Sequence, residues 1–192
     1  MALLAPSRRR PSLLVALAVL VTCISLAQGV VAQTSTVREY QIKAAFLFNF
    51  GQFVTWGPDD FPEATSPFVI GVLGEDPFGA TLDAIVEGES VQGRPVQIER
   101  YVDVDDVGSC HILFVSSSEL PRLDRVFERL RGRGILTVGE AEGFAERSGM
   151  IRFVVVDNRL RLEINAAAAE AAGLTISSRL LSLADVVRTE QE

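Results

Sequence analysis

The chain has 192 residues, of which 48% are hydrophobic, so it is long enough to bury a core of its own. Its 25 acidic residues outnumber its 18 basic residues and give a net charge of −7 at pH 7. A surface of this sign repels nucleic acid and anionic lipid headgroups, which argues against a function in binding either of them.

The first 32 residues have the order of a secretory signal peptide. The basic group Arg8–Arg10 precedes an apolar run, Leu13–Leu26, and Val30–Ala32 supplies the small residues of a cleavage site. The apolar run is about 14 residues long, which is shorter than the ~18–20 residues that span a bilayer as a helix. We therefore expect residues 1–32 to direct export and then to be removed.

Cleavage near Ala32 leaves residues 33–192, which we interpret as one periplasmic domain. The alternatives are an uncleaved membrane anchor and a lipid on Cys23, although Thr22 is larger than the residue that usually precedes a lipidated cysteine. The mature chain keeps 15 basic and 25 acidic residues, a net charge of −10. Of the two cysteines only Cys110 remains, so an internal disulfide is excluded, and this thiol is either buried and inert or free to react.

Residues 37–56 are predicted to form a helix with little polar surface. At 100° per residue, one apolar stripe consists of Ile42, Phe46, Phe50 and Phe53, and a second stripe consists of Tyr40, Leu47 and Val54. A helix of this kind is buried on more than one side. It is either an ordinary core helix or one whose aromatic stripe meets a partner protein or a second copy.

Strands and helices alternate along the rest of the chain. The predicted strands are 68–74, 95–101, 111–115 and 135–138. The predicted helices are 77–86, 119–130 with Ser118 as N-cap, and 166–172 with Asn165 as N-cap. A hairpin of 150–156 and 160–164 around 157–159 is also predicted, and a strand or turn followed by an apolar helix within 176–187. Alternation of this kind implies a largely parallel sheet covered on both faces. We expect an α/β fold: a three-layer sandwich with a flavodoxin-like sheet plus a C-terminal β-hairpin.

No pattern in the chain predicts a catalytic site. Cys110 and His111 are adjacent on a predicted strand, so their side chains point to opposite faces and are poorly placed to act as a pair. One cysteine and one histidine cannot supply the usual ligands of a zinc site within one chain. The serines at 116–118 lack the glycines of a nucleophile elbow and a second histidine as base. We expect no enzymatic activity, no metal and no cofactor.

A small-ligand pocket is a competing interpretation. Gly74 and Glu75 follow one predicted strand, and Ser116 and Ser117 follow another. The carboxyl ends of parallel strands meet at one sheet edge, where open α/β sheets bind ligands. The glycine spacing within 71–79 matches no nucleotide-binding fingerprint, and the acidic residues there would repel a phosphate.

Several short motifs, in a fixed order, together carry a family resemblance. They are Lys43–Trp56, Phe68–Gly74, Pro77–Gly79, Gly93–Val96, Cys110–Ser116, Gly149–Phe153, Leu162–Asn165 and Ala171–Ser178. In order and spacing they resemble the YfiR-like family (DUF4154) of exported bacterial regulatory proteins. The resemblance covers about residues 37–188.

The resemblance implies a periplasmic regulator that restrains a membrane-bound partner, typically a diguanylate cyclase, by binding its periplasmic sensor region. Release of that restraint raises cyclic di-GMP and favours biofilm growth. Some relatives are tuned by disulfide redox chemistry. In this chain a redox response would need an intermolecular bond through Cys110.

We therefore expect a non-catalytic regulator that binds the sensor region of an inner-membrane signalling protein, a diguanylate cyclase or a histidine kinase. Aromatic side chains dominate interface energies, so the candidate contact residues are Phe46, Phe50, Phe53 and Trp56. The same helix could instead join two copies in a homodimer. The alternatives from other classes are a small-ligand or anion-binding periplasmic protein that feeds a membrane histidine kinase, and a purely structural envelope protein.

Overall fold

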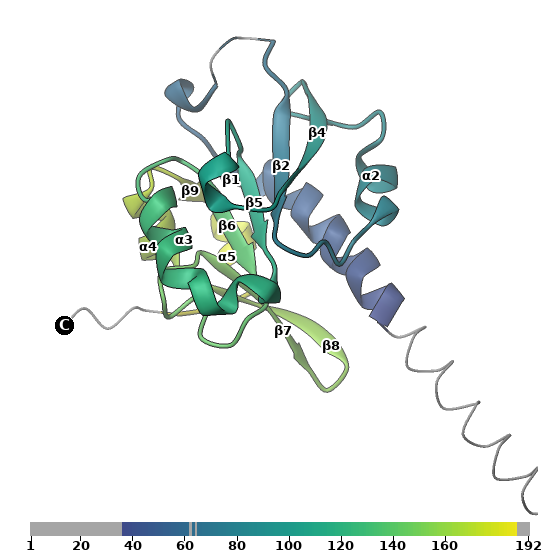
Figure 1. The fold of residues 1–192 in the computed structure, drawn as a ribbon, viewed down its shortest axis with the longest axis vertical. Coiled ribbons are helices and arrows are strands. Elements are labelled where there is room, and N and C mark those ends of the chain that lie inside the picture. Colours follow the sequence, from purple (N-terminus) through teal and green to yellow (C-terminus); the bar gives the residue numbers. More distant parts are fainter. Residues whose placement is uncertain (1–35, 62, 64, 188–192) are drawn as a thin grey trace, which may run out of the picture. The chain divides into compact units, whose positions relative to one another are not determined.

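The computed structural model describes residues 36–61, 63 and 65–187 (Figure 1). The predicted signal peptide at 1–32, its cleavage site and Cys23 lie outside the described residues. The described residues from Glu39 onward make up one compact unit, and the contacts given below lie within it. No helix in that part is both long and apolar enough to cross a membrane.

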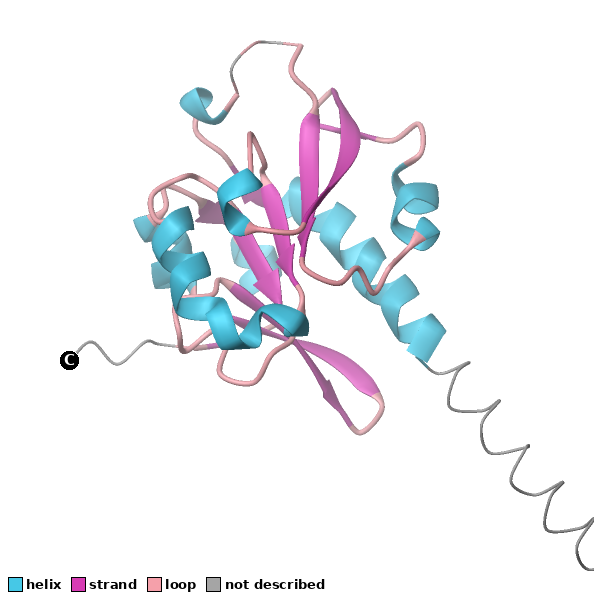
Figure 2. Ribbon diagram, in the orientation of Figure 1, coloured by secondary structure: helices cyan, strands magenta, loops and turns pink. Residues whose placement is uncertain are grey.

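Eight strands of the described chain form a mixed sheet in the order β10-β8-β7-β6-β5-β2-β4-β3. The strands are β2 (Phe68–Leu73), β3 (Ser90–Val91), β4 (Arg94–Tyr101), β5 (Ile112–Val115), β6 (Leu136–Gly139), β7 (Ile151–Val156), β8 (Arg159–Ile164) and β10 (Asp185–Val186). The five strands from β4 to β7 in this order are parallel, and β7 and β8 form the predicted antiparallel hairpin (Figure 2). A separate two-stranded ladder pairs β1 (Val54–Thr55) with β9 (Thr175–Ile176).

Alternate side chains of the central strands enter two cores, because successive strand residues point to opposite faces. Ile70 and Phe114 lie in the larger core, to which helix 39–53, α2 (Ala80–Val86), α4 (Ala166–Ala171) and α5 (Ser178–Leu181) contribute. Leu73 and Leu113 lie in the smaller core, to which α3 (Leu123–Leu130) contributes. Helices thus pack on both faces of a mostly parallel sheet, as expected for an α/β chain.

A regular three-layer, flavodoxin-like sandwich is not confirmed. The order of the five parallel strands does correspond to the doubly wound order 2-1-3-4-5. However, the connection from β4 to β5 contains only the short 3₁₀ helix η2 (Val104–Asp106), and residues 140–150 between β6 and β7 contain turns but no helix. Two of the crossovers therefore lack the covering helix that a repeated βαβ unit supplies.

Tertiary contacts shorten the predicted first helix. Helical residues end at position 53, because Val54 and Thr55 leave the helix to pair with Ile176 and Thr175. The apolar helix predicted within 176–187 is likewise reduced to the four residues of α5, since β10 follows it and pairs with β8. Helical periodicity alone could not show either pairing.

The segment predicted as one helix over 119–130 is divided. It begins as the 3₁₀ helix η3 (Ser117–Arg122), which contains Pro121, and continues as α3. The N-cap is Ser116 and not Ser118, because the Ser116 hydroxyl accepts the backbone N–H of Ser118. The capping prediction was therefore wrong by two residues.

Two local predictions are confirmed, the hairpin turn and the cap of α4. Asp157 and Asn158 have φ of 49° and 60°, the positive values that a two-residue type I′ turn requires. Asn165 Oδ1 accepts the Ala168 N–H at 3.0 Å, and its Nδ2 donates to the Ala145 carbonyl at 2.8 Å. Asn165 is fully buried. It caps α4 and also binds the turn segment 140–150 through the Ala145 carbonyl.

Asn165→Ala is expected to lower the free energy of unfolding by about 2–4 kcal/mol, because the helix loses its cap and a carbonyl loses its buried donor. Asn165→Ser keeps an acceptor for the cap but not the second bond, so its loss should be intermediate. Urea unfolding followed by circular dichroism measures both. A loss below about 0.5 kcal/mol for the alanine variant would show that neither bond matters.

Candidate functional site

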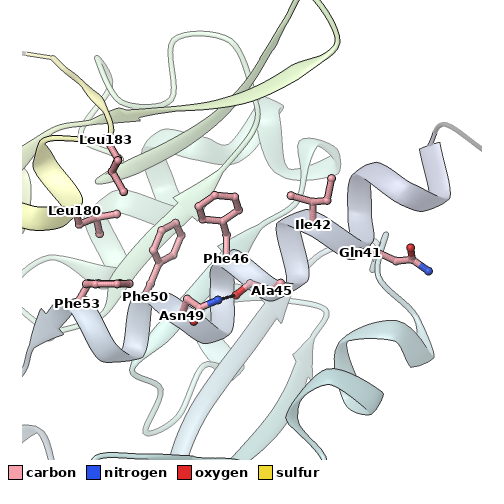
Figure 3. A pocket seen from close by; sticks show the side chains of 9 residues that line it. All are labelled: Gln41, Ile42, Ala45, Phe46, Asn49, Phe50, Phe53, Leu180 and Leu183. Atoms are coloured by element: carbon pink, nitrogen blue, oxygen red, sulfur yellow. Dashed lines mark hydrogen bonds between the residues drawn. The ribbon is translucent and has the colours of Figure 1, made fainter.

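An open groove of about 370 Å³ lies between helix 39–53 and the segment that carries α5 (Figure 3). We call this surface the helix groove. It is lined by Gln41, Ile42, Ala45, Phe46, Asn49, Phe50, Phe53, Leu180 and Leu183. Successive turns of the helix supply one wall, and the rings of Phe46 and Phe50 are directed toward the two leucines of the other wall.

The lining of the helix groove is mostly apolar and partly exposed. Ile42 keeps 43% of its surface exposed on one wall, and Leu183 keeps 69% on the other. The Asn49 side chain is tied to its own helix, since Nδ2 donates to the Ala45 carbonyl at 2.8 Å. Large apolar side chains exposed together around a hollow are typical of an interaction site, whereas singly scattered ones are not.

Backbone hydrogen bonds join the two walls at one end of the helix groove. β1 pairs with β9, and the Ser177 N–H donates to the Phe53 carbonyl at 2.9 Å. The Ser177 hydroxyl then caps α5 by accepting the Leu180 N–H at 3.3 Å. The Arg179 guanidinium lies 5.8 Å from the centre of the Phe53 ring, which places a cation beside the apolar lining. The groove is therefore shaped by a long-range pairing and not by the helix alone.

The structure separates the four predicted contact residues into two pairs. Phe46 and Phe53 are half-buried on the groove wall. Phe50 is 0% exposed and stacks on Phe153 with ring centres 6.0 Å apart, and Trp56 is 6% exposed. The last two side chains are buried in the larger core, so this structure offers little of their surface to a partner. Direct contact by Phe46 and Phe53 stays a prediction.

Sequence reasoning missed two parts of the groove. Ile42 shares its helical stripe with Phe46, so its position could have been included from periodicity. Leu180 and Leu183 could not have been predicted from periodicity, because the pairing of β1 with β9 is what brings α5 against the helix.

A buried cluster of charges fixes the same helix to the end of β6. The Lys43 side chain is 4% exposed, and its Nζ lies 2.5 Å from both Glu39 Oε1 and Glu140 Oε2. The Tyr40 hydroxyl donates to Glu140 Oε1 at 3.0 Å. Burial, together with the charge of Glu140, raises the pKa of Tyr40 above its usual value, so this hydroxyl remains a donor. No sequence pattern pairs Lys43 with a residue 97 positions away.

Nothing in the described part of the chain brings three or more histidine, cysteine or acidic side chains together as a metal site would. The model of the YfiR/HmsC-like family (DUF4154) matches residues 40–185, which include the helix groove and the central sheet apart from Val186 of β10. The chain belongs to the YfiR/HmsC-like family. This match confirms the resemblance predicted from the motifs. A search of curated proteins found no match to the chain. This family consists of periplasmic regulators rather than enzymes, and it indicates a role in cyclic di-GMP signalling.

In this YfiR/HmsC-like protein the Cys110 thiol is buried. It is 7% exposed and donates to the Ile112 carbonyl at 3.0 Å. Burial raises the pKa of Cys110 to about 12, so the reactive thiolate is scarce at neutral pH. The redox role considered for this cysteine gains no support from its surroundings.

The YfiR/HmsC-like fold brings together the residues considered for a small-ligand pocket, Gly74, Glu75, Ser116 and Ser117. The Glu75 N–H donates to Ser118 Oγ at 3.0 Å, and a Cβ added to Gly74 would lie only 2.4 Å from the same oxygen. The Ser117 hydroxyl donates to Glu140 at 3.3 Å. Ser118 thus occupies the space between the two loops, and a ligand there would have to displace it.

Proposed function

We propose that this YfiR/HmsC-like protein is a non-catalytic regulator that binds the periplasmic sensor region of an inner-membrane diguanylate cyclase and restrains its output. In this proposal residues 1–32 direct export and are removed near Ala32, leaving residues 33–192 as one domain. The observation that carries the proposal is the helix groove, because its exposed Ile42 and Leu183 can be covered by an apolar surface of a partner.

The shape and lining of the helix groove suit an apolar helix of the partner. Between Ile42 and Phe53 the wall helix rises about 16 Å, or three turns, at 1.5 Å per residue. A helix laid alongside it would place apolar anchors at i, i+3 or i+4, and i+7, as in other helix-in-groove complexes. Gln41 and Arg179 stand beside the apolar lining, where polar residues form the rim of a typical interface.

Binding restrains the partner only if the groove prefers one of the partner's conformations. A preference of about 1–3 kcal/mol changes the population of that conformation by 5–150-fold. Burial of one or two large apolar side chains contributes about that much. A protein with this groove can therefore change the output of a membrane enzyme without a catalytic residue of its own.

Charges placed on both walls of the groove should abolish partner binding and leave the fold intact. In the double variant Ile42→Glu/Leu183→Glu, affinity for the isolated sensor region of the cyclase should fall at least ~30-fold, because two carboxylates would be buried without partners. Since both positions are exposed, the free energy of unfolding should change by less than about 1 kcal/mol. Calorimetric titration measures the affinity, and urea unfolding checks the fold.

Val102→Glu is the matched control, because Val102 is 84% exposed and does not line the groove. It should bind the sensor region as the unmodified protein does. Equal affinities for the double variant and this control would contradict the docking site. Light scattering tests the alternative of a homodimer. If the unmodified protein is a dimer and the double variant is a monomer, the groove joins two copies.

A further inference from the structure

His111, the only histidine of the chain, is enclosed by aromatic rings. It is 2% exposed, and its imidazole stacks between Phe61 and Phe68 with centroid distances of 4.5 and 4.8 Å and interplanar angles near 20°. The Trp56 ring meets it edge-on at 6.3 Å. Phe61 and Trp56 belong to the segment 56–61, which includes the short 3₁₀ helix η1 (Pro58–Asp60) and which we call the aromatic latch.

A backbone hydrogen bond sets the protonation state of this ring. The Val69 N–H donates to His111 Nδ1 at 3.0 Å, so Nδ1 is an acceptor and the imidazole is neutral with its proton on Nε2. A second proton would occupy Nδ1 and point at the Val69 N–H, which would set two donors against each other. The folded arrangement therefore accommodates only the neutral ring.

Ring contacts hold the aromatic latch over the histidine. Trp56, which is 6% exposed, meets the Phe68 ring of β2 edge-on with ring centres 5.0 Å apart. The Arg94 guanidinium covers the Phe61 ring at 4.0 Å. Arg94 Nη1 also donates to the carbonyls of Glu63 and Ser66, at 2.9 and 2.8 Å, just beyond the latch. Two sets of ring contacts therefore link this segment to the sheet: the stack of Arg94, Phe61 and His111, and the pair of Trp56 with Phe68.

The charges that act on His111 come from the latch and from β4. Burial of the ring lowers the pKa of His111 below its ordinary value of 6.5. The Asp60 backbone and then the Asp60 charge oppose this shift, the Arg94 charge of β4 adds to it, and the Val69 backbone opposes it more weakly. On β2 the contacting residues Phe68 and Val69 carry no charge. A lowered pKa in the folded state means that the neutral ring stabilises the closed latch fully above pH 6.5, and that this contribution is lost as the pH falls below 6.5.

We propose that the aromatic latch is an acid-released element: when His111 takes up a second proton, Trp56 and Phe61 leave the ring while the sheet stays folded. Below pH 6.5 the released population should rise by up to tenfold per pH unit until the folded-state pKa is reached. Trp56 follows β1 directly, and Phe53 of the helix groove lies three residues earlier, so release also loosens one end of the groove. The proposal does not depend on what binds there.

The sequence makes the test simple, because Trp56 is the only tryptophan and His111 the only histidine. In the tag-free protein, Trp56 fluorescence should shift to longer wavelength between pH 7.5 and 4.5. The midpoint should lie below 6.5 and coincide with the titration of the His111 ring protons by NMR. Hydrogen exchange at sheet amides such as Leu113 should stay slow across the same range. A tryptophan signal that does not change while the histidine titrates would overturn the proposal, and so would loss of sheet protection at the same midpoint.

Two variants sharpen the test. His111→Asn keeps an acceptor for the Val69 N–H but does not titrate, so its Trp56 signal should not change between pH 6.5 and 5. Asp60→Asn keeps an acceptor for the Gly57 N–H, a bond of 2.7 Å in the unmodified protein, but removes the facing charge, so the midpoint should move to lower pH. An unchanged transition in His111→Asn would overturn the proposal. If His111→Asn does not fold, the proposal is tested by the direction in which Asp60→Asn moves the midpoint of the transition: a move to lower pH supports it, and any other result overturns it.

Discussion

Phe50→Ala should lower the free energy of unfolding by about 3–5 kcal/mol, the usual loss when a fully buried phenylalanine is removed. The Phe50 ring is 0% exposed and packs against Phe46 and Phe153, each with ring centres 6.0 Å away. Truncation to alanine would leave a cavity in the larger core beside these two rings.

Phe53→Ala is the informative comparison for Phe50→Ala. Both residues lie on one stripe of the same helix, but Phe53 is only half-buried on the groove wall, so its loss should be clearly smaller. Urea unfolding of the two variants gives both values. Comparable losses would contradict the assignment of Phe50 to the core and Phe53 to the groove.

Lys43→Met should also be strongly destabilising, by about 3–5 kcal/mol, because it breaks a buried ion pair by removing one partner. Its Nζ lies 2.5 Å from Glu140, whose side chain is 16% exposed and would be left without its counter-charge. Methionine has a similar volume, so most of the loss would be electrostatic and not due to a cavity.

The double variant Lys43→Met/Glu140→Gln separates these causes. Glutamine removes the negative charge and keeps an acceptor for the Tyr40 hydroxyl, so the double variant should recover more than half of the lost stability. Thermal unfolding of the single and double variants provides the measurement. A double variant as unstable as the sum of its single changes would show that Lys43 does not stabilise the fold through its pairing with Glu140.

Local patterns in the sequence predicted much of the fold. The continuous apolar runs of β2 and β5 are buried on both faces, the Asp157-Asn158 turn closes the hairpin, and Asn165 caps α4. Each of these depends on residues close together in the chain, where periodicity, turn chemistry and capping act.

The features that define the candidate site depend instead on contacts between distant residues. Phe50 and Phe53 share a helical stripe and both line the groove, yet Phe50 is fully buried against Phe153 and Phe53 stays partly exposed. The sequence carries no signal for that difference. The same holds for the pairing of Lys43 with Glu140. Helical periodicity therefore predicted the helix and its apolar stripes, but it carried no signal that Phe50 and Trp56 would be buried in the core while Phe46 and Phe53 stay partly exposed.

Site-specific photo-crosslinking in living cells is the most direct test of whether a diguanylate cyclase docks in the helix groove. A benzophenone amino acid replaces Ile42, which is exposed in the helix groove, and in a parallel strain it replaces Val102, which is exposed outside it. Irradiation should join position 42, but not position 102, to an inner-membrane protein with a diguanylate cyclase domain. Position 42 joined only to a second copy of this chain, or equal adducts from both positions, would contradict docking of the cyclase in the groove.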